Sequence, residues 1–522
     1  MTGGAPEQTP PPPDPTSPDR AAIPRHSRRR FLAGLGVVAG AGALAACGLP
    51  AQAGATRPIG PHDPAVAAVE AARRRPGAPV RYFTLTPGPR TIDLGGPQVS
   101  TWGYGDAATG PEIRAIAGDV LRIRVDDQLP VTGPDQGATT VHWHGIALRN
   151  DMDGVPVLTQ DPLGSGRSQI YEFTAPDPGT YWYHPHVGVQ FDRALQGPLI
   201  IDDPREPGGY DVEFVVVLDD WVDGTGRTPD DVLAGLRAHG MSMGGMDGGT
   251  PPSAVGGDGG DVDYPYYLVN GRVPTAPTVF SARPGQRARI RVINVGGDTA
   301  FRVALGSHPI TVTHTDGYPT RPVVGDAVLV GEAERVDLLV TLGDGAFPLV
   351  ASAEGKSGQA QALVRTSPDA SAPPAGARPP ELAGRLLTVA DLGAADSVAV
   401  PERAPDRIHE VVLGGDMGTY VWTLNGRSFD QRIPLPVTAG QRVRLTFRNP
   451  TSMFHPMHLH GHTFTVRTGG ATPGPRKDTV IVLPNQSVTV DFDANNPGQW
   501  ATHCHNIYHE ASGMMTAVSY QA

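Results

Sequence analysis

A short stretch near the C-terminus carries the residues best suited to bind a transition metal. The segment ATHCHNIYHEASGMM, residues 501–515, contains Cys504, one of only two cysteines in the chain. Two imidazoles, a thiolate and a weak thioether form the ligand set of a blue copper electron-transfer site. A buried free cysteine beside surface histidines is the alternative. Histidines at −1, +1 and +5 from Cys504 and a methionine at +10 favour the copper site, provided that partner ligands exist elsewhere.

The residues before this stretch predict how it is held. SVTVDFDANNPGQW alternates apolar and polar residues and then turns at Asn-Pro-Gly, so we expect ATHCH to begin as a β-strand. Side chains along a strand point alternately to opposite faces. His503 and His505 therefore face one way and Cys504 the other, so that one short strand could serve two metal sites back to back.

The chain contains an internal repeat. A Gly-Asp or Gly-Gln turn followed by an alternating strand occurs as IAGDVLRIRVDDQLP from Ile116, RPGQRARIRVINVGG from Arg283 and TAGQRVRLTFRNPTS from Thr438. The first and third copies are soon followed by His-x-His-Gly, at His142 and His458, whereas the second is followed by AFRVALG. The sequence therefore predicts three related units, of which the middle one has no ligands.

The ends of the first and third units also correspond. Alignment of PDPGTYWYHPH with NNPGQWATHCH on Pro-Gly puts Pro185 where Cys504 stands, and upstream Thr139 stands where His455 stands. The first unit therefore has a His-x-His pair at each end but cannot build a blue copper site, whereas the third unit can.

Four His-x-His pairs at equivalent places supply eight imidazoles. Their simplest use is a copper cluster between the first and third units, with four histidines from each. A single pair would be weak support because surface pairs occur by chance, but four pairs within a repeat are strong support. The pairs are His142 and His144, His184 and His186, His458 and His460, and His503 and His505.

Composition indicates a chain of several domains with many short strands and turns. With 522 residues the chain is too long for one hydrophobic core, so two to four domains are expected. The 66 glycines, 54 prolines and 18% charged residues suit many short strands and turns rather than long helices. The formal net charge of −11 argues against nucleic acid as a partner.

The N-terminus is typical of an export signal. SRRRFL, residues 27–32, fits a twin-arginine pattern, and the mild apolar run after it ends in LAAC at Cys47, which resembles a bacterial lipobox. The run is too short and too rich in glycine for a permanent membrane span. An ordinary buried helix is the alternative, which the arginines and the Pro-rich leader disfavour. We expect an exported protein, lipid-anchored through Cys47 to the outer face of the cytoplasmic membrane.

The segments HWHG, HPH, HPMHLHGH and HCHNIYHEASGM resemble, in that order, the four copper signatures of the multicopper oxidases. The resemblance runs from about Val80 to the C-terminus and includes LRNDMDG, YPYYLVNGR, THTDGYP and RKDTVIVLP. The sequence is most similar to three-domain, laccase-like oxidases of the exported actinobacterial lipoprotein type, which are linked to copper tolerance.

This resemblance implies an all-β fold of three consecutive cupredoxin-like Greek-key β-sandwich domains. The expected divisions are a signal segment at 1–47, a linker at 48–79, domain 1 at 80–205, domain 2 without copper ligands at 206–375, and domain 3 with type 1 copper at 376–522. A trinuclear cluster would lie between domains 1 and 3.

The resemblance also implies four copper ions, one of type 1, one of type 2 and a type 3 pair. It assigns type 1 copper to His455, Cys504, His509 and axial Met514, with Met515 as the alternative axial ligand. It assigns type 2 copper to His142 and His458. The type 3 ligands, whose division between the two ions stays open, would be His144, His184, His186, His460, His503 and His505.

The implied reaction reduces dioxygen to water, which takes four electrons, whereas substrates give one each. The type 1 site would accept electrons singly, and Cys504 would pass them through its backbone neighbours to the cluster. Glu510 matches the proton-donating carboxylate of the family, and Asp153 matches an acid beside the cluster. A turn residue before Gly154 is the alternative role for Asp153.

Two features bear on the substrate. Asp478 in RKDTV stands where metal-oxidising relatives have an acid beside the type 1 histidine, and there it could bind Cu(I) or Fe(II) or accept the proton of a phenol. The segment HGMSMGGMDGG holds Met241, Met243 and Met246, whose soft thioethers favour Cu(I). A Gly-rich loop with incidental methionines is the alternative.

The predicted function is therefore oxidation of Cu(I) or Fe(II) coupled to reduction of dioxygen, with a role in copper tolerance. A phenol-oxidising laccase would share every copper ligand and stays open. A copper nitrite reductase is disfavoured because it normally has two domains with the blue site in the first. A non-enzymatic cupredoxin-fold scaffold, the weakest alternative, requires missing ligands, and here the set is complete.

Overall fold

A computed structural model of the chain describes residues 57–206, 208–240, 253–256, 259–468 and 473–522. The expected signal segment with Cys47, and the methionines Met241, Met243 and Met246, lie outside these residues. The described residues form mainly β-strands joined by turns, with three short α-helices, so the expected all-β class is confirmed.

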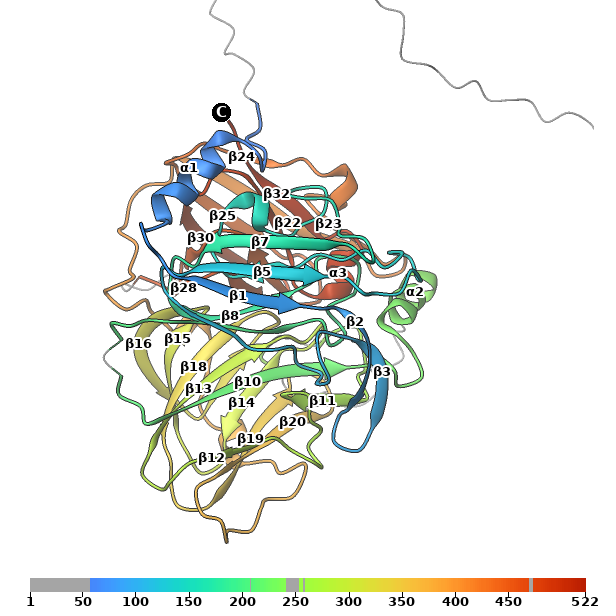
Figure 1. The fold of residues 1–522 in the computed structure, drawn as a ribbon. Coiled ribbons are helices and arrows are strands. Elements are labelled where there is room, and N and C mark those ends of the chain that lie inside the picture. The colour runs from blue at the N-terminus through green and yellow to red at the C-terminus, as the bar shows by residue number, and fades with distance from the viewer. Residues whose placement is uncertain (1–56, 207, 241–252, 257–258, 469–472) are drawn as a thin grey trace, which may run out of the picture. The chain divides into compact units, whose positions relative to one another are not determined.

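The thrice-repeated motif forms an equivalent strand in each of three units. These strands are β5 (Val120–Asp126), β13 (Arg287–Asn294) and β25 (Arg442–Arg448). Each pairs in parallel with an early strand of its unit, namely β1 (Val80–Leu85), β10 (Val212–Trp221) and β22 (Arg407–Asp416). Each pairs antiparallel with a later one, namely β7 (Ser168–Thr174), β18 (Arg335–Thr341) and β30 (Ser487–Asp493). Figure 1 shows β1, β5 and β7 side by side.

The turn before each repeated strand requires glycine. Gly118, Gly285 and Gly440 have φ angles of +90°, +83° and +87°, a left-handed conformation that other residues adopt only with strain. The same local chemistry therefore starts the same strand in all three units.

The first unit has two sheets and a hairpin. The sheets have the strand orders β1-β5-β7 and β4-β9-β8-β6, and β2 pairs with β3. The remaining bounds are β2 (Gly88–Asp93), β3 (Gln98–Gly103), β4 (Ile113–Ile116), β6 (His142–His144), β8 (Gly179–His184) and β9 (Gly197–Asp202).

The second unit has two six-stranded sheets, with the orders β11-β10-β13-β18-β15-β16 and β12-β20-β19-β14-β17-β21. Because β21 pairs with β17, this unit extends beyond residue 375, where the sequence predicts its end. The remaining bounds are β11 (Tyr266–Val269), β12 (Val279–Ser281), β14 (Phe301–Leu305), β15 (Ile310–Thr315), β16 (Tyr318–Gly325), β17 (Ala327–Val330), β19 (Ala346–Ala353), β20 (Gln359–Arg365) and β21 (Leu386–Leu387).

The third unit has sheets of six and five strands, with the orders β23-β22-β25-β30-β27-β28 and β24-β32-β31-β26-β29. The remaining bounds are β23 (Val421–Leu424), β24 (Leu435–Val437), β26 (His455–Leu459), β27 (Phe464–Val466), β28 (Arg476–Lys477), β29 (Thr479–Val482), β31 (Gln499–Cys504) and β32 (Met515–Tyr520).

The helices are short. They are α1 (Pro64–Arg73), α2 (Pro229–His239) and α3 (Ile507–Ala511), with 3₁₀ turns at Asn150–Met152, Pro380–Ala383, Val389–Asp391 and Phe429–Gln431. No helix within the described residues has the length and hydrophobicity needed to cross a membrane.

The segment before the first strand packs on two units. Glu70 of α1 accepts hydrogen bonds from the backbone N–H (2.9 Å) and hydroxyl (2.7 Å) of Thr174 in β7. Ile59 N–H donates to the Tyr520 carbonyl of β32 at 2.8 Å. The described part of residues 48–79, which the sequence analysis treats as a linker, is thus hydrogen-bonded to the first and third units.

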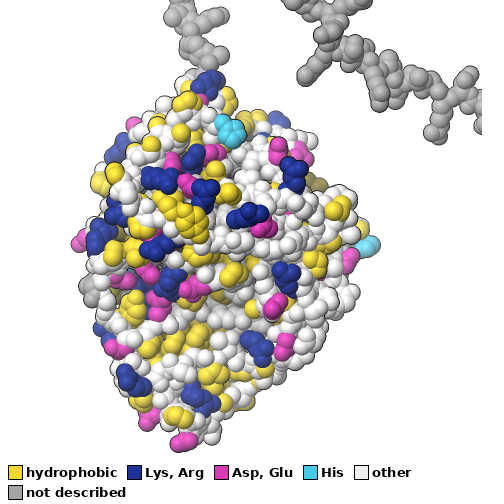
Figure 2. Space-filling view, viewed as in Figure 1, with side chains coloured by type: hydrophobic (Ala, Val, Ile, Leu, Met, Phe, Trp, Pro, Cys, Tyr) yellow, Lys and Arg dark blue, Asp and Glu magenta, His cyan; other side chains and the backbone are white. Residues whose placement is uncertain are grey.

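The clustered histidines contribute little to the molecular surface. Acidic and basic side chains are intermixed over the face seen in Figure 2, where few histidines are visible. Those in the predicted copper pairs are buried, with at most 7% of any one exposed.

Candidate metal centre

Strand β31 organises two sets of metal-binding side chains. It lies between β26 and β32, with Met457 opposite Cys504 and His458 opposite His503. Cys504 lies with His455 and His509, whereas His503 lies with two other histidines. Neighbouring residues of one strand thus belong to different sets, as the alternation of side chains predicts.

Eight buried histidines form three groups, of which two share His144. In each group, nitrogens from three rings lie within 4.8 Å of one another. The groups are His142, His144 and His458; His144, His184 and His505; and His186, His460 and His503. Each group draws on the first and the third unit, so neither unit could form one alone.

The hydrogen bonds of His460 and His503 indicate what these groups can bind. His460 Nδ1 lies 3.0 Å from Asp153 Oδ2, and His503 Nδ1 lies 2.9 Å from the Cys504 carbonyl oxygen. Because a carboxylate and a carbonyl accept hydrogen bonds, each Nδ1 carries the ring proton and each Nε2 presents a lone pair. The two Nε2 atoms are 3.0 Å apart. Two lone pairs this close repel each other, whereas a cation bound by both would hold them together.

Several other ring nitrogens of the groups are buried without a hydrogen-bond partner. They are Nε2 of His142, His184 and His458, Nδ1 of His144, and both nitrogens of His505. A buried unpaired polar atom costs about 1–3 kcal/mol, which a bound metal ion would offset. Burial also lowers the pKa of His144, His184 and His505 well below the usual value, which favours the neutral, metal-binding imidazole.

The sulfur set is a separate triangle of donors in the third unit. Cys504 Sγ lies 3.6 Å from Nδ1 of both His455 and His509, and these two nitrogens are 3.2 Å apart. His455 Nε2 is 2.9 Å from Thr451 Oγ1, so that its Nδ1 is left to face the sulfur. One sulfur and two imidazole nitrogens suit the trigonal plane of a blue copper site.

Packing distinguishes the two methionines after this triangle. Met514 is fully buried, and its carbonyl oxygen accepts the backbone N–H of Cys504 at 3.1 Å. Met515 packs with Val155 in an apolar cluster apart from Cys504. Met514 is therefore the better candidate for the axial thioether.

Glu510 lies against two histidines of one group. Its Oε1 is 3.2 Å from His186 Nδ1, and its Oε2 is 3.1 Å from His503 Nδ1. The side chain is 8% exposed, and Glu510 lies on α3, the turn of helix that also carries His509. Glu510 therefore follows a residue of the sulfur set in the sequence, but its carboxylate faces the histidine groups.

Asp153 also lies against two histidines. Its Oδ2 is 3.0 Å from His460 Nδ1 and its Oδ1 is 3.2 Å from His142 Nδ1. Burial raises the pKa of the carboxyl above its usual value. Gly154 has a φ of +80°, and a Cβ there would come within 2.0 Å of a backbone oxygen. Asp153 is thus a turn residue whose carboxylate also lies against two histidines of the groups.

Asp478 does not lie where the sequence analysis expects it. The structure places it away from His455 and His509 and completely buried, with Oδ1 3.2 Å from His144 Nε2 and its carbonyl oxygen 2.8 Å from His458 Nδ1. Strand pairing is the cause, because β29 sets Thr479 opposite His458 and Val482 opposite His455. The prediction that Asp478 meets a substrate at the sulfur set is therefore wrong.

The acid beside the sulfur set comes from the middle unit instead. Asp261 Oδ2 lies 2.9 Å from His509 Nε2 and also accepts a hydrogen bond from the Tyr420 hydroxyl. Its side chain is buried. Asp261 could not be predicted from the sequence because it lies 248 positions from His509, in a stretch rich in glycine and aspartate that has no histidine, cysteine or methionine close to Asp261.

The glycine that ends each His-x-His-Gly motif, Gly145 or Gly461, makes room for a neighbouring side chain. A Cβ at Gly145 would come within 2.4 Å of Arg335 Nη2 and 2.8 Å of Asp478 Oδ2, and a Cβ at Gly461 would come within 2.3 Å of Trp500. Both glycines have positive φ angles, +85° and +63°. The His-x-His-Gly motif therefore encodes packing as well as ligands.

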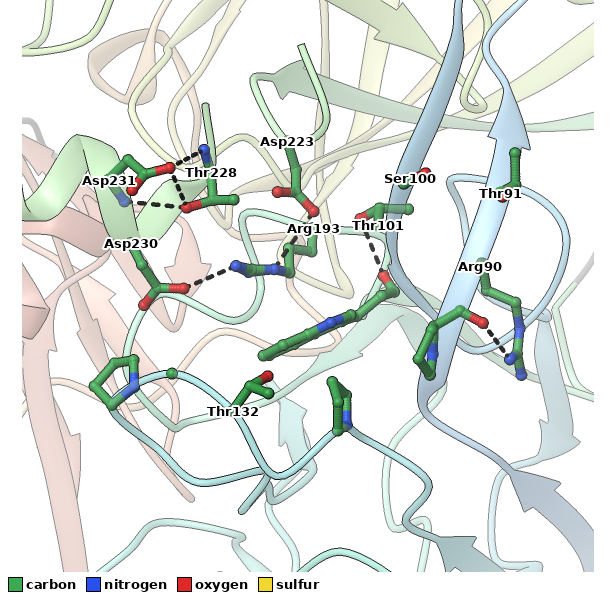
Figure 3. A pocket seen from close by; sticks show the side chains of 15 residues that line it. Arg90, Thr91, Ser100, Thr101, Thr132, Arg193, Asp223, Thr228, Asp230 and Asp231 are labelled. Carbon is green, nitrogen blue, oxygen red and sulfur yellow. Dashed lines mark hydrogen bonds and ion pairs between the residues drawn. The ribbon is translucent and has the colours of Figure 1, made fainter. Parts of the chain in front are cut away.

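A groove of about 670 Å³ lies apart from these sets, between the β2–β3 hairpin and the start of α2. Figure 3 shows Arg193 between Asp223 and Asp230, and its guanidinium carbon lies 4.2 Å from the centre of the Trp102 ring. No histidine or cysteine is among the described residues that line the groove. We assign it no part in the metal chemistry.

Comparison with known proteins identifies the family. Three models of the multicopper oxidase family match residues 88–206, 213–368 and 402–522. The chain is 49% identical to multicopper oxidase MmcO of Mycobacterium tuberculosis, over 95% of this chain and 97% of that protein. It is 27% identical to a copper resistance protein A homolog of Pseudomonas syringae pv. tomato, over 84% of this chain and 92% of that protein.

A solved structure shares the fold. The multicopper oxidase of Pseudomonas thermotolerans superposes with a TM-score of 0.65 and 28% identity, over 85% of this chain and all of that one (100%). The repeated units of this chain are therefore similar to the cupredoxin-like domains that the sequence analysis expects.

Proposed function

The chain belongs to the multicopper oxidase family, and on this basis we propose that it oxidises Cu(I) or Fe(II) one electron at a time while reducing dioxygen to water, in the service of copper tolerance. One observation carries the proposal. The side chain of Cys504 belongs to the sulfur set, while both of its covalent neighbours belong to the histidine groups. Two sites for redox metals are thus joined by the peptide bonds of a single strand.

The four copper ions of the family fit these donor sets. We assign type 1 copper to His455, Cys504, His509 and Met514, and type 2 copper to His142 and His458. The grouping of nitrogens supports a division of the type 3 ligands into His144, His184 and His505 for one ion and His186, His460 and His503 for the other. Copper, when bound, supplies one-electron transfer at the sulfur set and oxygen reduction at the histidine groups.

The chain's own carboxylates would handle the protons that oxygen reduction consumes. Glu510 and Asp153 each touch two cluster histidines, and both are buried or nearly so. Burial alone would raise the pKa of Glu510, but His186 and His503 lower it, so the carboxylate would relay protons to these two rings rather than store one. We therefore assign proton delivery to Glu510 and a supporting role to Asp153.

Replacing Glu510 by glutamine tests this assignment. The amide keeps the size of the side chain but cannot deliver a proton, so turnover with any substrate should fall by about a hundredfold or more. Copper content and blue colour should stay near those of the parent. Loss of copper in proportion to activity would contradict the assignment, because Glu510 would then only hold the two imidazoles in place.

The surroundings of the sulfur set support a metal ion as substrate. Asp261 offers a carboxylate at His509 Nε2. Met417 also lies near the set. Its Sδ is 3.9 Å from the hydroxyl of Ser452, which follows Thr451, and Thr451 is hydrogen-bonded to His455. The thioether of Met417 suits Cu(I), whereas the buried Asp261 carboxylate would orient His509 rather than meet the substrate ion.

Gly240, the last described residue before the methionine-rich segment, lies against Met417. A Cβ there would come within 2.6 Å of the Met417 carbonyl oxygen. We propose that Met241, Met243 and Met246 help to capture Cu(I). A laccase-type role remains the second candidate, because a phenol oxidase would share every copper ligand.

Changing Met241, Met243 and Met246 together to serine should raise the apparent KM for Cu(I) several-fold. The KM for Fe(II) and for a phenol should change little, because thioethers bind those reductants weakly. Asp261→Asn is the contrasting variant. It lies at His509, so it should slow oxidation of every reductant. Equal Cu(I) kinetics in the triple variant and the parent would leave the segment without this role.

Steady-state oxygen uptake with Cu(I), Fe(II) and a bulky phenol, each offered alone, decides between the two functions. A higher kcat/KM for Cu(I) or Fe(II) than for the phenol is expected. Preference for the phenol would replace the metal-oxidase proposal with the laccase-type one.

We also propose export by the twin-arginine route and lipid attachment at Cys47. The support is the sequence of residues 27–47, which lies outside the described residues. Export of folded protein suits a chain whose metal sites need two units already docked.

A further inference from the structure

A cation from the middle unit reaches the edge of the histidine groups. Arg335, at the start of β18, is completely buried. Its Nη1 and Nη2 donate to Asp478 Oδ1 at 2.7 Å and Oδ2 at 2.6 Å, and its Nε donates to the Thr180 carbonyl at 3.0 Å. Residues of all three units therefore meet at this guanidinium.

Asp478 in turn holds one histidine from each ligand-bearing unit. Its Oδ1 faces His144 Nε2 at 3.2 Å, and its carbonyl oxygen accepts from His458 Nδ1 at 2.8 Å. His144 Nδ1 and His458 Nε2 are thereby the nitrogens left to face the groups, and both are buried without a partner. The partner of one ring nitrogen decides which nitrogen a metal can use.

The main chain of Asp478 is fixed by the same unit. Asp316 Oδ2 accepts the backbone N–H groups of Asp478 and Thr479, both at 3.1 Å. Asp316 Oδ1 accepts the backbone N–H of Arg335 at 2.9 Å. Lys477 Nζ lies 3.1 Å from Asp316 Oδ2 and balances its charge. Two residues of the middle unit thus hold Asp478: Arg335 binds its side chain and Asp316 binds its backbone.

We propose that Arg335 is a positioning residue of the trinuclear copper site. Acting through Asp478, it sets the orientation of His144 and His458, so that the unit without copper ligands controls the geometry at the type 2 ion and one type 3 ion. A guanidinium that binds both oxygens of a carboxylate fixes its plane, whereas a lysine ammonium is a point charge and does not. This inference rests on the copper assignment of the proposed function.

Arg335→Lys is the test, because it keeps the buried charge and loses the two-point contact. Arg302→Lys is the matched control. Arg302 also binds both oxygens of a carboxylate, Glu354 (2.9 and 3.0 Å), and a backbone carbonyl, but within the middle unit alone. The readouts are copper per chain, the type 2 signal in electron paramagnetic resonance, the type 1 absorption, and the melting temperature of the copper-free protein.

Arg335→Lys should keep the type 1 absorption but weaken copper binding at the trinuclear site by about 10- to 100-fold and change the type 2 signal. Because the Arg302 side chain is 21% exposed, Arg302→Lys should lower the melting temperature no more than Arg335→Lys and should change neither signal. An unchanged type 2 signal and full copper content in Arg335→Lys would overturn the inference. A parent protein without any type 2 signal would instead overturn the copper assignment itself.

A double-mutant cycle with Asp478→Asn shows whether Arg335 acts through Asp478. The double variant should bind copper about as weakly as Asp478→Asn alone, because the second change removes the target of the first. Fully additive losses would overturn the inference. If Arg335→Lys does not fold while Arg302→Lys does, Asp478→Asn decides, because it keeps Arg335. Loss of the type 2 signal in folded Asp478→Asn would support the positioning role. An unchanged type 2 signal in that variant would mean that Arg335 has a purely structural role.

Discussion

Replacement of Cys504 by serine should bleach the copper-loaded protein and abolish its oxidase activity. Cys504 Sγ is the only sulfur in the triangle with the two imidazole nitrogens, 3.6 Å from each, and a serine hydroxyl is a poor ligand for copper. The strong thiolate-to-copper absorption should vanish, and oxygen uptake should fall to background with every reductant.

The fold and the other copper ions should survive this change. Serine is smaller than cysteine, and the histidine groups face the opposite side of β31. The type 2 signal should therefore persist, with a melting temperature near that of the parent. Met515→Leu is a matched control, because Met515 packs in a separate cluster and should leave the colour unchanged. A blue Cys504→Ser protein would remove the type 1 assignment.

Local spacing encodes most of this site, which is why it can be predicted from the sequence. A His-x-His pair on a strand places both rings on one face, and an intervening cysteine points to the other. The internal repeat then shows which pairs must meet, because equivalent strands occupy equivalent places. His503, Cys504 and His505 are thus predicted from three consecutive letters and one structural rule.

The surrounding carboxylates depend on tertiary contacts that spacing does not encode. The error on Asp478 comes from the register of two strands, since β29 aligns Thr479 with His458 rather than with His455. That register follows from long-range packing. Asp261 and Arg335 are harder still, because both come from the middle unit, where the sequence has no ligands and offers no reason to search.

The glycines show an intermediate case. Gly145 is visible in the sequence as part of a motif, but its physical reason is the passage of Arg335 and Asp478 within 2.4 and 2.8 Å of its missing side chain. A motif can therefore be recognised before the contact that requires it is known. The middle unit influences the copper ligands through this packing although it supplies none of them.

Replacement of His458 by alanine should stop oxygen reduction while the protein stays blue. His458 joins His142 and His144 of the first unit in one group, and its Nε2 is buried without a partner. Its removal leaves the type 2 ion one imidazole short, whereas the sulfur triangle keeps all its donors. We expect loss of the type 2 signal, loss of about one copper per chain, and oxygen uptake near background, with the type 1 absorption largely retained.

The nearby His462 provides the control that separates a ligand from any buried histidine. It is also buried, but both of its nitrogens have partners within the third unit, the His460 carbonyl at 3.0 Å and the Tyr520 hydroxyl at 2.7 Å. His462→Gln should therefore keep its copper content and type 2 signal even if it lowers the melting temperature. If His458→Ala lost its blue colour together with oxygen uptake, the two donor sets would not be independent sites. The division into a sulfur site and a histidine cluster would then have to be abandoned, because a ligand of one would be needed to build the other.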